Sequence, residues 1–305
     1  MTRKNLVSGL GWITLTILCW APLFSVVKRT LPAIDPFTLA TLRYVLGVVL
    51  FAFLLVAMEG RQAMRYEGRF VAAAVFGLVG IGGFNLFVWV GLLFTMPEHA
   101  AVISALQTPL TALAVWLLRG QRPAWVTLGC VALAILGVVL VVTRGNLTEA
   151  AYGGALVGDV LVLLGAICWV SYTFAASYFT GWSALRISAL TCIPGLAGLL
   201  IANGIAVAAG WARLPTLGTL GSLAWQILYL SLCTVVLGVL GFNNATRKLG
   251  PLNAMLMLNF IPVLVFGIEA WLGRSFSAME FAGAVIVVAA LIANNLYLRG
   301  VSTRR

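Results

Sequence analysis

The sequence predicts an all-α integral membrane protein whose ten transmembrane helices form two inverted five-helix repeats. Of its 305 residues, 62% are hydrophobic and only 9% are charged, a composition that soluble globular domains of this size do not show. Apolar runs of about 20 residues, enough to cross roughly 30 Å of hydrocarbon as a helix, recur along the whole chain. The connectors between them are short, so no stretch remains for a soluble domain.

A repeated proline-containing segment indicates the internal duplication. Residues 99–120 and 252–273 are both apolar and helix-length, and a shift of 153 positions (262 − 109) places Pro109 on Pro262. The same shift aligns two further pairs, Ala101 with Ala254 and Gly120 with Gly273. Proline removes a backbone donor, and the freed carbonyl is tolerated at membrane depth only against protein or a wet cavity. Pro109 and Pro262 are therefore expected to kink their helices beside a transport site, the alternative being ordinary kinks in packed helices.

Hydropathy places ten helices in order along the chain. They lie near residues 7–27, 34–57, 70–94, 99–118, 124–142, 156–179, 185–209, 221–245, 251–272 and 278–298. The first resembles a secretory signal, because basic residues precede an apolar run. Nine later spans, and no small-residue cleavage site, instead indicate a first membrane helix.

Lysine and arginine are unevenly distributed between the connectors. With a cytoplasmic amino terminus, thirteen fall on the inside: Arg3, Lys4, Arg61, Arg65, Arg69, Arg119, Arg122, Arg186, Arg247, Lys248, Arg299, Arg304 and Arg305. Five fall outside: Lys28, Arg29, Arg144, Arg213 and Arg274. Because cytoplasmic loops are enriched in positive residues, we expect both termini in the cytoplasm.

The two halves divide at the polar, glycine-bearing connector near residues 145–154, giving repeats at 1–145 and 146–305. The first helix of each half carries a Cys-Trp pair, at residues 19–20 and 168–169. Five helices per half is an odd number, so the second copy enters the membrane in the opposite direction. Alternating-access carriers are commonly built on such inverted repeats.

Polar residues near the membrane midplane are costly and therefore mark candidate binding sites. Gln107 lies just before Pro109, Asn259 just before Pro262, and Asn85 near the middle of the third helix. Amide side chains both donate and accept, which suits the ammonium and carboxylate of an amino acid. Hydrogen bonding between packed helices is the alternative.

Aromatic residues supply the other part of the expected substrate pocket. Five lie inside spans rather than at the interfaces, where tryptophan is usually enriched: Trp20, Phe84, Trp89, Trp169 and Tyr172. Trp20 and Trp169 occupy equivalent places in the two halves, so we expect them to face each other. Packing in the core or against lipid is the alternative for each.

Glycines are frequent in the third and eighth helices. Four of them are candidate gating hinges or sites of close helix contact: Gly80, Gly83, Gly238 and Gly241. The Gly-Phe-Asn triplets at 83–85 and 241–243 are offset by 158 (241 − 83), against 153 in the neighbouring helices, and are interpreted as a coincidence.

Ionisable residues are expected to lie shallowly. Asp159 and Glu269 fall toward the outer ends of their helices, and Arg43 in the outer part of the second, too shallow to bind substrate. His99 follows Glu98 at an outer loop and is expected to be solvent-exposed. The lack of an acid near the midplane argues against a buried carboxylate proton relay.

Three motifs run through the first half: Trp20…Lys28…Arg43-Tyr44, apolar-Ala-Ala-apolar-Leu-x-x-Pro ending at Pro109, and Gly129…Gly137. The second half repeats them through Trp169, Ala254, Pro262, Glu269 and Gly283. Together they resemble the drug/metabolite transporter superfamily, specifically its EamA-type exporters, across essentially the whole chain. Members with this layout include aromatic amino-acid exporters, so the resemblance implies a ten-helix exporter of a bacterial inner membrane. Where such helices often end in glutamate, the first copy has Leu118-Arg119.

We therefore predict a secondary transporter, not an enzyme, that exports aromatic or neutral amino acids or similar small metabolites. The five cysteines lie in apolar spans without CxxC spacing, so neither a metal site nor a cofactor is expected. The net charge of +11 is spread over span ends and does not indicate nucleic acid, which leaves membrane lipids and a small-molecule substrate as partners. The oligomeric state stays open, with a monomer as one option. The alternatives are an exporter of drugs or nucleosides, a membrane enzyme acting on lipid-linked substrates, and a non-transporting scaffold.

Overall fold

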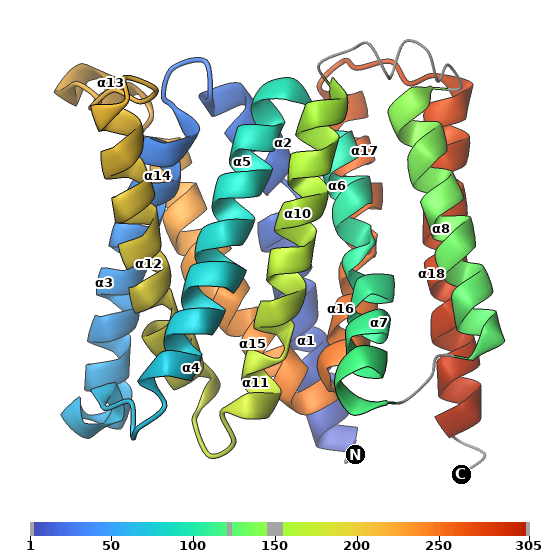
Figure 1. Cartoon of the computed structure of the whole chain (residues 1–305), viewed down its shortest axis with the longest axis horizontal. Helices are drawn as coiled ribbons and strands as arrows, with labels where there is room; N and C mark the ends of the chain where they lie inside the picture. Colours follow the sequence, from blue (N-terminus) through green and yellow to red (C-terminus); the bar gives the residue numbers. More distant parts are fainter. Residues whose placement is uncertain (1–2, 121–123, 145–154, 303–305) are drawn as a thin grey trace.

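The computed structural model describes residues 3–120, 124–144 and 155–302 (Figure 1). These residues form helices joined by short turns and contain no strand. The first half comprises α1 Arg3–Trp20, α2 Leu23–Thr30, α3 Pro36–Glu59, the 3-10 turn η1 Arg61–Met64, α4 Phe70–Val75, the π-helix η2 Phe76–Gly83, α5 Phe84–Phe94, α6 Pro97–Ala105, α7 Gln107–Arg119 and α8 Trp125–Thr143. The second comprises α10 Ala155–Thr173, α11 Ala175–Tyr178, α12 Ala184–Ala208, α13 Leu217–Ser222, α14 Ala224–Tyr229, the π-helix η3 Leu230–Val239, α15 Leu240–Leu249, α16 Pro251–Leu258, α17 Phe260–Trp271 and α18 Ala278–Ser302.

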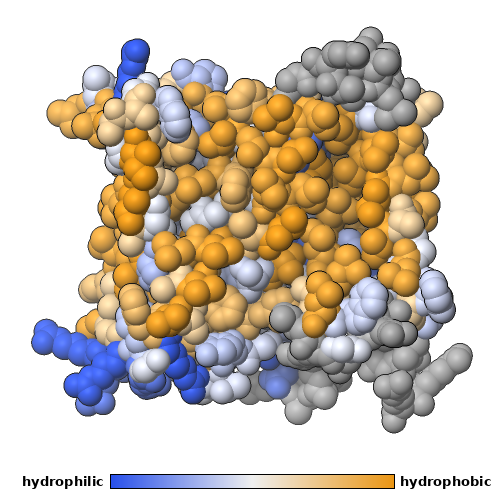
Figure 2. Space-filling view, viewed as in Figure 1, coloured by the Kyte–Doolittle hydropathy of each residue, from blue (hydrophilic) through white to orange (hydrophobic). Residues whose placement is uncertain are grey.

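Within the described residues, nine helical spans are long and apolar enough to cross a membrane, and a shorter apolar segment, Ala278–Asn294, follows them. Each corresponds to one of the ten helices expected from hydropathy. The surface agrees with this assignment, since hydrophobic side chains cover the middle of the bundle and hydrophilic ones gather at its ends (Figure 2). The chain is an all-helical membrane protein.

The two halves run in opposite directions and are interrupted at matching places. Both termini lie at one end of the bundle; α1 rises from that end, and α10 descends toward it (Figure 1). The first span of each half breaks, before Pro22 and at Phe174, and the third span of each half contains a π-helix. The fourth spans break at Leu106 and Asn259, which are 153 positions apart (259 − 106). The two halves therefore share not only sequence positions but also the places at which their helices are interrupted.

Pairs of glycines bring neighbouring helices close together. A Cβ at Gly137 of α8 would lie 2.7 Å from the carbonyl oxygen of Gly283 in α18, and a Cβ at Gly283 would lie 2.5 Å from that of Gly137. Gly91 of α5 and Gly158 of α10 have the same reciprocal relation, at 2.8 and 2.6 Å. The α8–α18 pair packs at the periphery of the bundle, away from the central helices (Figure 1). Small residues allow the backbones to approach closely where no hydrophobic driving force operates between helices.

Candidate functional site

A cavity lies between the two repeats, at the level of the helix breaks. It holds about 660 Å³ of space not filled by atoms, including its opening. The first, third, fourth, sixth, eighth and ninth spans all line it, as the positions of the polar and aromatic residues suggest, and the second span contributes as well. The lining residues are Trp20, Leu23, Phe24, Arg43, Tyr44, Phe84, Ala101, Ser104, Ala105, Gln107, Thr108, Trp169, Thr234, Val239, Met255, Leu258, Asn259, Ile261 and Pro262.

Aromatic rings form one wall of the cavity. The rings of Trp20 and Trp169 meet edge to face, with centroids 5.2 Å apart, so the structure brings the two equivalent tryptophans together. Phe84 packs on Trp169 at 5.1 Å, and Phe242 packs on Trp20 at 5.7 Å. Such edge-to-face and tilted contacts fix ring orientation beyond simple burial. The wall is apolar and contains residues of both repeats.

Amide side chains lie at the two helix breaks, and a proline follows each break by three residues. Asn259 sits at the break itself; its Oδ1 accepts from the Thr108 hydroxyl at 3.2 Å, and its Nδ2 has no hydrogen-bond partner. Gln107 begins α7 and also lines the cavity. Pro109 and Pro262 lack the N–H that would bond the carbonyls of the residues four positions earlier, Ala105 and Leu258, and both of these line the cavity. The prolines thus lie where breaks and cavity coincide.

Arg43 corrects the expectation that it lies too shallow to bind substrate. Its side chain lines the cavity and is only 3% exposed. The guanidinium donates to Asn85 Oδ1 and, over 2.9 Å, to Thr234 Oγ1. It also lies over the ring of Trp89, 4.3 Å from the centroid. The arginine therefore reaches inward from α3 to the centre of the bundle, and its Nε keeps no partner.

Thr234 joins the cation to the aromatic wall. Its hydroxyl accepts from Arg43, and its backbone oxygen accepts from the indole Nε1 of Trp20 at 2.8 Å. Thr234 lies in η3, and π-helical turns leave carbonyls without the regular i−4 pattern. The eighth span thus positions both Arg43 and Trp20.

Three predicted site residues do not reach the cavity. Asn85 is fully buried, bonds Arg43 and receives no solvent. Trp89 is fully buried beneath Arg43, and Tyr172 is fully buried behind Trp169, with ring centroids 5.0 Å apart. These three pack against residues that line the cavity and lie one layer behind its wall.

The four candidate hinge glycines all sit at close helix contacts. A Cβ at Gly238 would lie 2.1 Å from Trp20 Nε1, and one at Gly241 would lie 2.5 Å from Thr16 Oγ1. A Cβ at Gly80 would lie 2.5 Å from Tyr172 Cβ, and one at Gly83 would lie 2.9 Å from Cys168 Sγ; both contacts are with α10, in the sixth span. These distances leave no room for a larger side chain, so each of the four glycines allows close packing of its helix against a neighbour. Hinge motion at these glycines stays a prediction.

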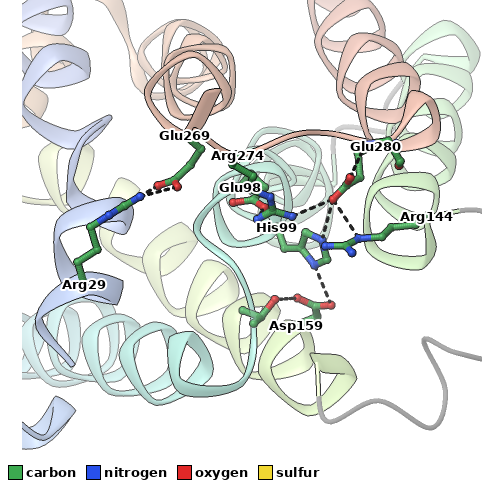
Figure 3. A network of polar contacts seen from close by, with 10 residues as sticks. Arg29, Glu98, His99, Arg144, Asp159, Glu269, Arg274 and Glu280 are labelled. Carbon is green, nitrogen blue, oxygen red and sulfur yellow. Dashed lines mark hydrogen bonds and ion pairs between the residues drawn. The ribbon is translucent and has the colours of Figure 1, made fainter. Parts of the chain in front are cut away.

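Charged side chains form a network that Figure 3 shows from close by. It lies at the end of the bundle opposite the start of α1, where α10 begins and α17 ends (Figure 1); we call this the distal end. Arg29 of α2 forms a two-pronged ion pair with Glu269 of α17, both bonds being 2.9 Å. Arg274 contacts Glu98 and bonds Glu280 at 3.0 Å. The Arg29–Glu269 and Arg274–Glu98 pairs connect the two repeats, and the Arg274–Glu280 bond lies within the second repeat.

The expectation of an exposed histidine is wrong. His99 lies in α6 and is 3% exposed, because the packing of α10 and α18 covers it. Its Nδ1 is 3.6 Å from Asp159 Oδ2, and Glu280, which pairs with Arg144 at 3.1 Å, lies on its other side. Among the described residues, no group of three His, Cys, Asp or Glu side chains is arranged to hold a metal ion.

Comparison with known proteins finds a transporter family model that matches both halves of the chain, and relatives that are named as transporters. The EamA-like transporter family matches residues 7–143 and, a second time, residues 156–296. The chain is 26% identical over 303 residues to an uncharacterized transporter, YrdR, of Bacillus subtilis (strain 168), covering 98% of this chain and 94% of the relative. It is 23% identical over 294 residues to an uncharacterized inner membrane transporter, YedA, of Escherichia coli (strain K12), covering 96% and 92%.

A solved crystal structure has the same fold. It aligns with a TM-score of 0.69 and 20% sequence identity, covering 97% of this chain and 99% of the other. The whole described bundle, rather than one repeat, is therefore shared.

Proposed function

The chain belongs to the EamA-like transporter family and is a multi-pass membrane transporter, and we propose that it exports aromatic or other apolar amino acids, or similar small metabolites, by alternating access. The membrane is a bacterial inner membrane with both termini in the cytoplasm, as the thirteen-to-five basic bias favours. The cavity would then load from the cytoplasm and release on the distal side.

One observation supports this proposal above the others: a cavity built from both repeats at their matching breaks. It combines aromatic rings, Trp20 and Trp169, with the amides Gln107 and Asn259 and with backbone carbonyls whose usual helical N–H partner is replaced by a proline nitrogen. Apolar pockets with a few placed polar groups are typical of small-molecule sites. In inverted-repeat carriers such sites lie at the interface of the repeats, where discontinuous helices supply backbone groups.

The charged side chains at the distal end support the proposal that transport occurs by alternating access. The Arg29–Glu269 pair joins the first span to the ninth, and therefore one repeat to the other. Ion pairs of this kind can close one entrance while the other is open. The two helices that carry them also line the cavity, which couples the entrance to the site.

Transport in proteoliposomes tests the proposal. Purified protein is reconstituted with one unlabelled compound inside the vesicles, and uptake of the same compound in radiolabelled form is measured for each member of a panel of amino acids, nucleosides and cationic drugs. Saturable exchange of phenylalanine or leucine supports the proposal. Movement of nucleosides or drugs without amino acids would replace it with the drug or nucleoside alternative, and no movement of any member would reject this substrate range.

A further inference from the structure

We propose that Arg43 forms an anion subsite in the cavity that binds the carboxylate of the substrate, with the apolar part of the substrate against Trp20 and Trp169. This inference rests on the proposed function, because it assigns a chemical class to the substrate of the same cavity. It makes the carboxylate the group that decides binding.

The first step is the unbalanced charge. Arg43 is buried, and none of the residues lining the cavity is acidic. Its polar contacts in the described structure are with neutral groups, the amide oxygen of Asn85 and the hydroxyl of Thr234. A buried cation without an anion is costly, and the π faces of Trp89 and Tyr44 offset only part of that cost. A ligand that brings one negative charge would complete the site.

The second step is the set of unused donors. Three buried polar atoms of cavity-lining residues have no partner: Arg43 Nε, Asn259 Nδ2 and Ser104 Oγ. Each can donate a hydrogen bond, and an ionised carboxylate is acceptor-only. Charge-assisted hydrogen bonds between a guanidinium and a carboxylate are among the strongest in proteins. The unsatisfied chemistry of the cavity therefore matches a carboxylate.

The third step separates carboxylates from other charged ligands. A cationic drug would place its charge beside Arg43 and lose affinity by like-charge repulsion. A phosphate dianion would need a second cation, and Arg43 is the one lysine or arginine among the lining residues. The cavity thus favours a monoanionic or zwitterionic ligand with an apolar body.

A ligand series on the wild-type protein tests this without any variant. Affinities are measured by thermal shift and by titration calorimetry for three compounds with one ring and one chain length: phenylalanine, 3-phenylpropionate and phenethylamine. We expect the two carboxylates to bind and phenethylamine to bind roughly ten- to a hundredfold more weakly, as expected for loss of a hydrogen-bonded charge pair. Equal affinity of phenethylamine and phenylalanine would overturn the inference while leaving export intact, whereas failure of all three would count against the proposed substrate range.

Variants then assign the effect to Arg43. Arg43→Gln should lower the affinity for 3-phenylpropionate roughly ten- to a hundredfold, and Arg43→Lys should recover part of it because the charge is kept. Arg186→Gln is the matched control, since Arg186 bonds Glu67 and the Arg65 carbonyl away from the cavity. Full affinity of a folded Arg43→Gln protein would refute the assignment. If Arg43→Gln does not fold, the wild-type ligand series still decides.

Discussion

The Arg29–Glu269 pair is predicted to hold the distal entrance closed. It spans the two repeats through two parallel 2.9 Å hydrogen bonds, the geometry in which a guanidinium and a carboxylate interact best. Glu269 is nearly buried, at 6% side-chain exposure, and Arg29 is 47% exposed. Replacing Arg29 by Gln removes the pair and leaves a buried carboxylate without its cation. The expected result is a larger population of the distally open state.

The magnitude follows from these exposures. Exposed ion pairs contribute about 0.2–1 kcal/mol, and half of Arg29 is in contact with solvent or headgroups, so the pair is discounted to about 1 kcal/mol. That corresponds to roughly a fivefold change in the ratio of closed to open molecules. The orphaned Glu269 adds a further cost of about 1 kcal/mol or more to the closed state. The single variant should therefore open the entrance about five- to thirtyfold more often.

Cysteine labelling measures this population. In a background with the five native cysteines replaced, Ser104→Cys places a thiol in the cavity. A membrane-impermeant maleimide is added from the distal side, and the labelling rate reports opening. Arg29→Gln should accelerate labelling, and the exchanged pair Arg29→Glu with Glu269→Arg should return the rate toward that of the parent. An exchanged pair that labels as fast as the single variant would refute the gate.

Three further changes test packing, pH dependence and substrate size. Gly137→Leu should lower stability in detergent by about 1–3 kcal/mol, because its Cβ meets a carbonyl oxygen of the partner helix, whereas Gly129→Leu, which faces open space, should leave the melting temperature unchanged. The pKa of Glu67 is lowered by hydrogen bonding from the Trp182 indole and then by Arg186, so this contact is complete above about pH 4.3 and is lost as pH falls through the lowered value. Glu67→Gln should therefore speed hydrogen exchange at residues 179–183 at pH 7, with the difference from the wild type narrowing as pH falls through the lowered pKa of Glu67. Trp20→Ala should weaken counterflow of phenylalanine more than of alanine; equal losses would argue against an aromatic wall.

The spans and the two interruptions beside the prolines could be predicted because both depend on local sequence. Membrane crossing needs about 20 consecutive apolar residues, and ten such runs are separated by polar connectors. The breaks at Leu106 and Asn259 lie just before Pro109 and Pro262, whose missing donors interrupt the helix. The 153-residue shift between the prolines therefore returns as the shift between the breaks. No sequence signal predicted the π-helices, although glycines mark the end of η2.

Depth along a helix does not fix what a long side chain touches, and this explains the wrong expectations. Arg43 is the eighth residue of α3, about 12 Å from its end, which suggested a shallow group. Its flexible stem carries the guanidinium further, to Asn85 and Thr234 on other spans. His99 was assigned to a loop because a polar pair precedes the apolar run, but helix α6 begins at Pro97 and other helices cover it. Both positions depend on tertiary contacts that hydropathy does not encode.

The three predicted residues behind the cavity wall change how substitutions there are interpreted. Asn85 and Trp89 hold Arg43 from two sides, and Tyr172 supports Trp169 while its hydroxyl accepts from Asn243 at 2.9 Å. Because none of them borders the cavity, a substitution at these positions acts by moving a residue that does. Loss of Asn85 should impair carboxylate binding, and loss of Tyr172 should impair discrimination between side chains. Polarity and aromaticity therefore predicted residues near the cavity, but not which of them line it.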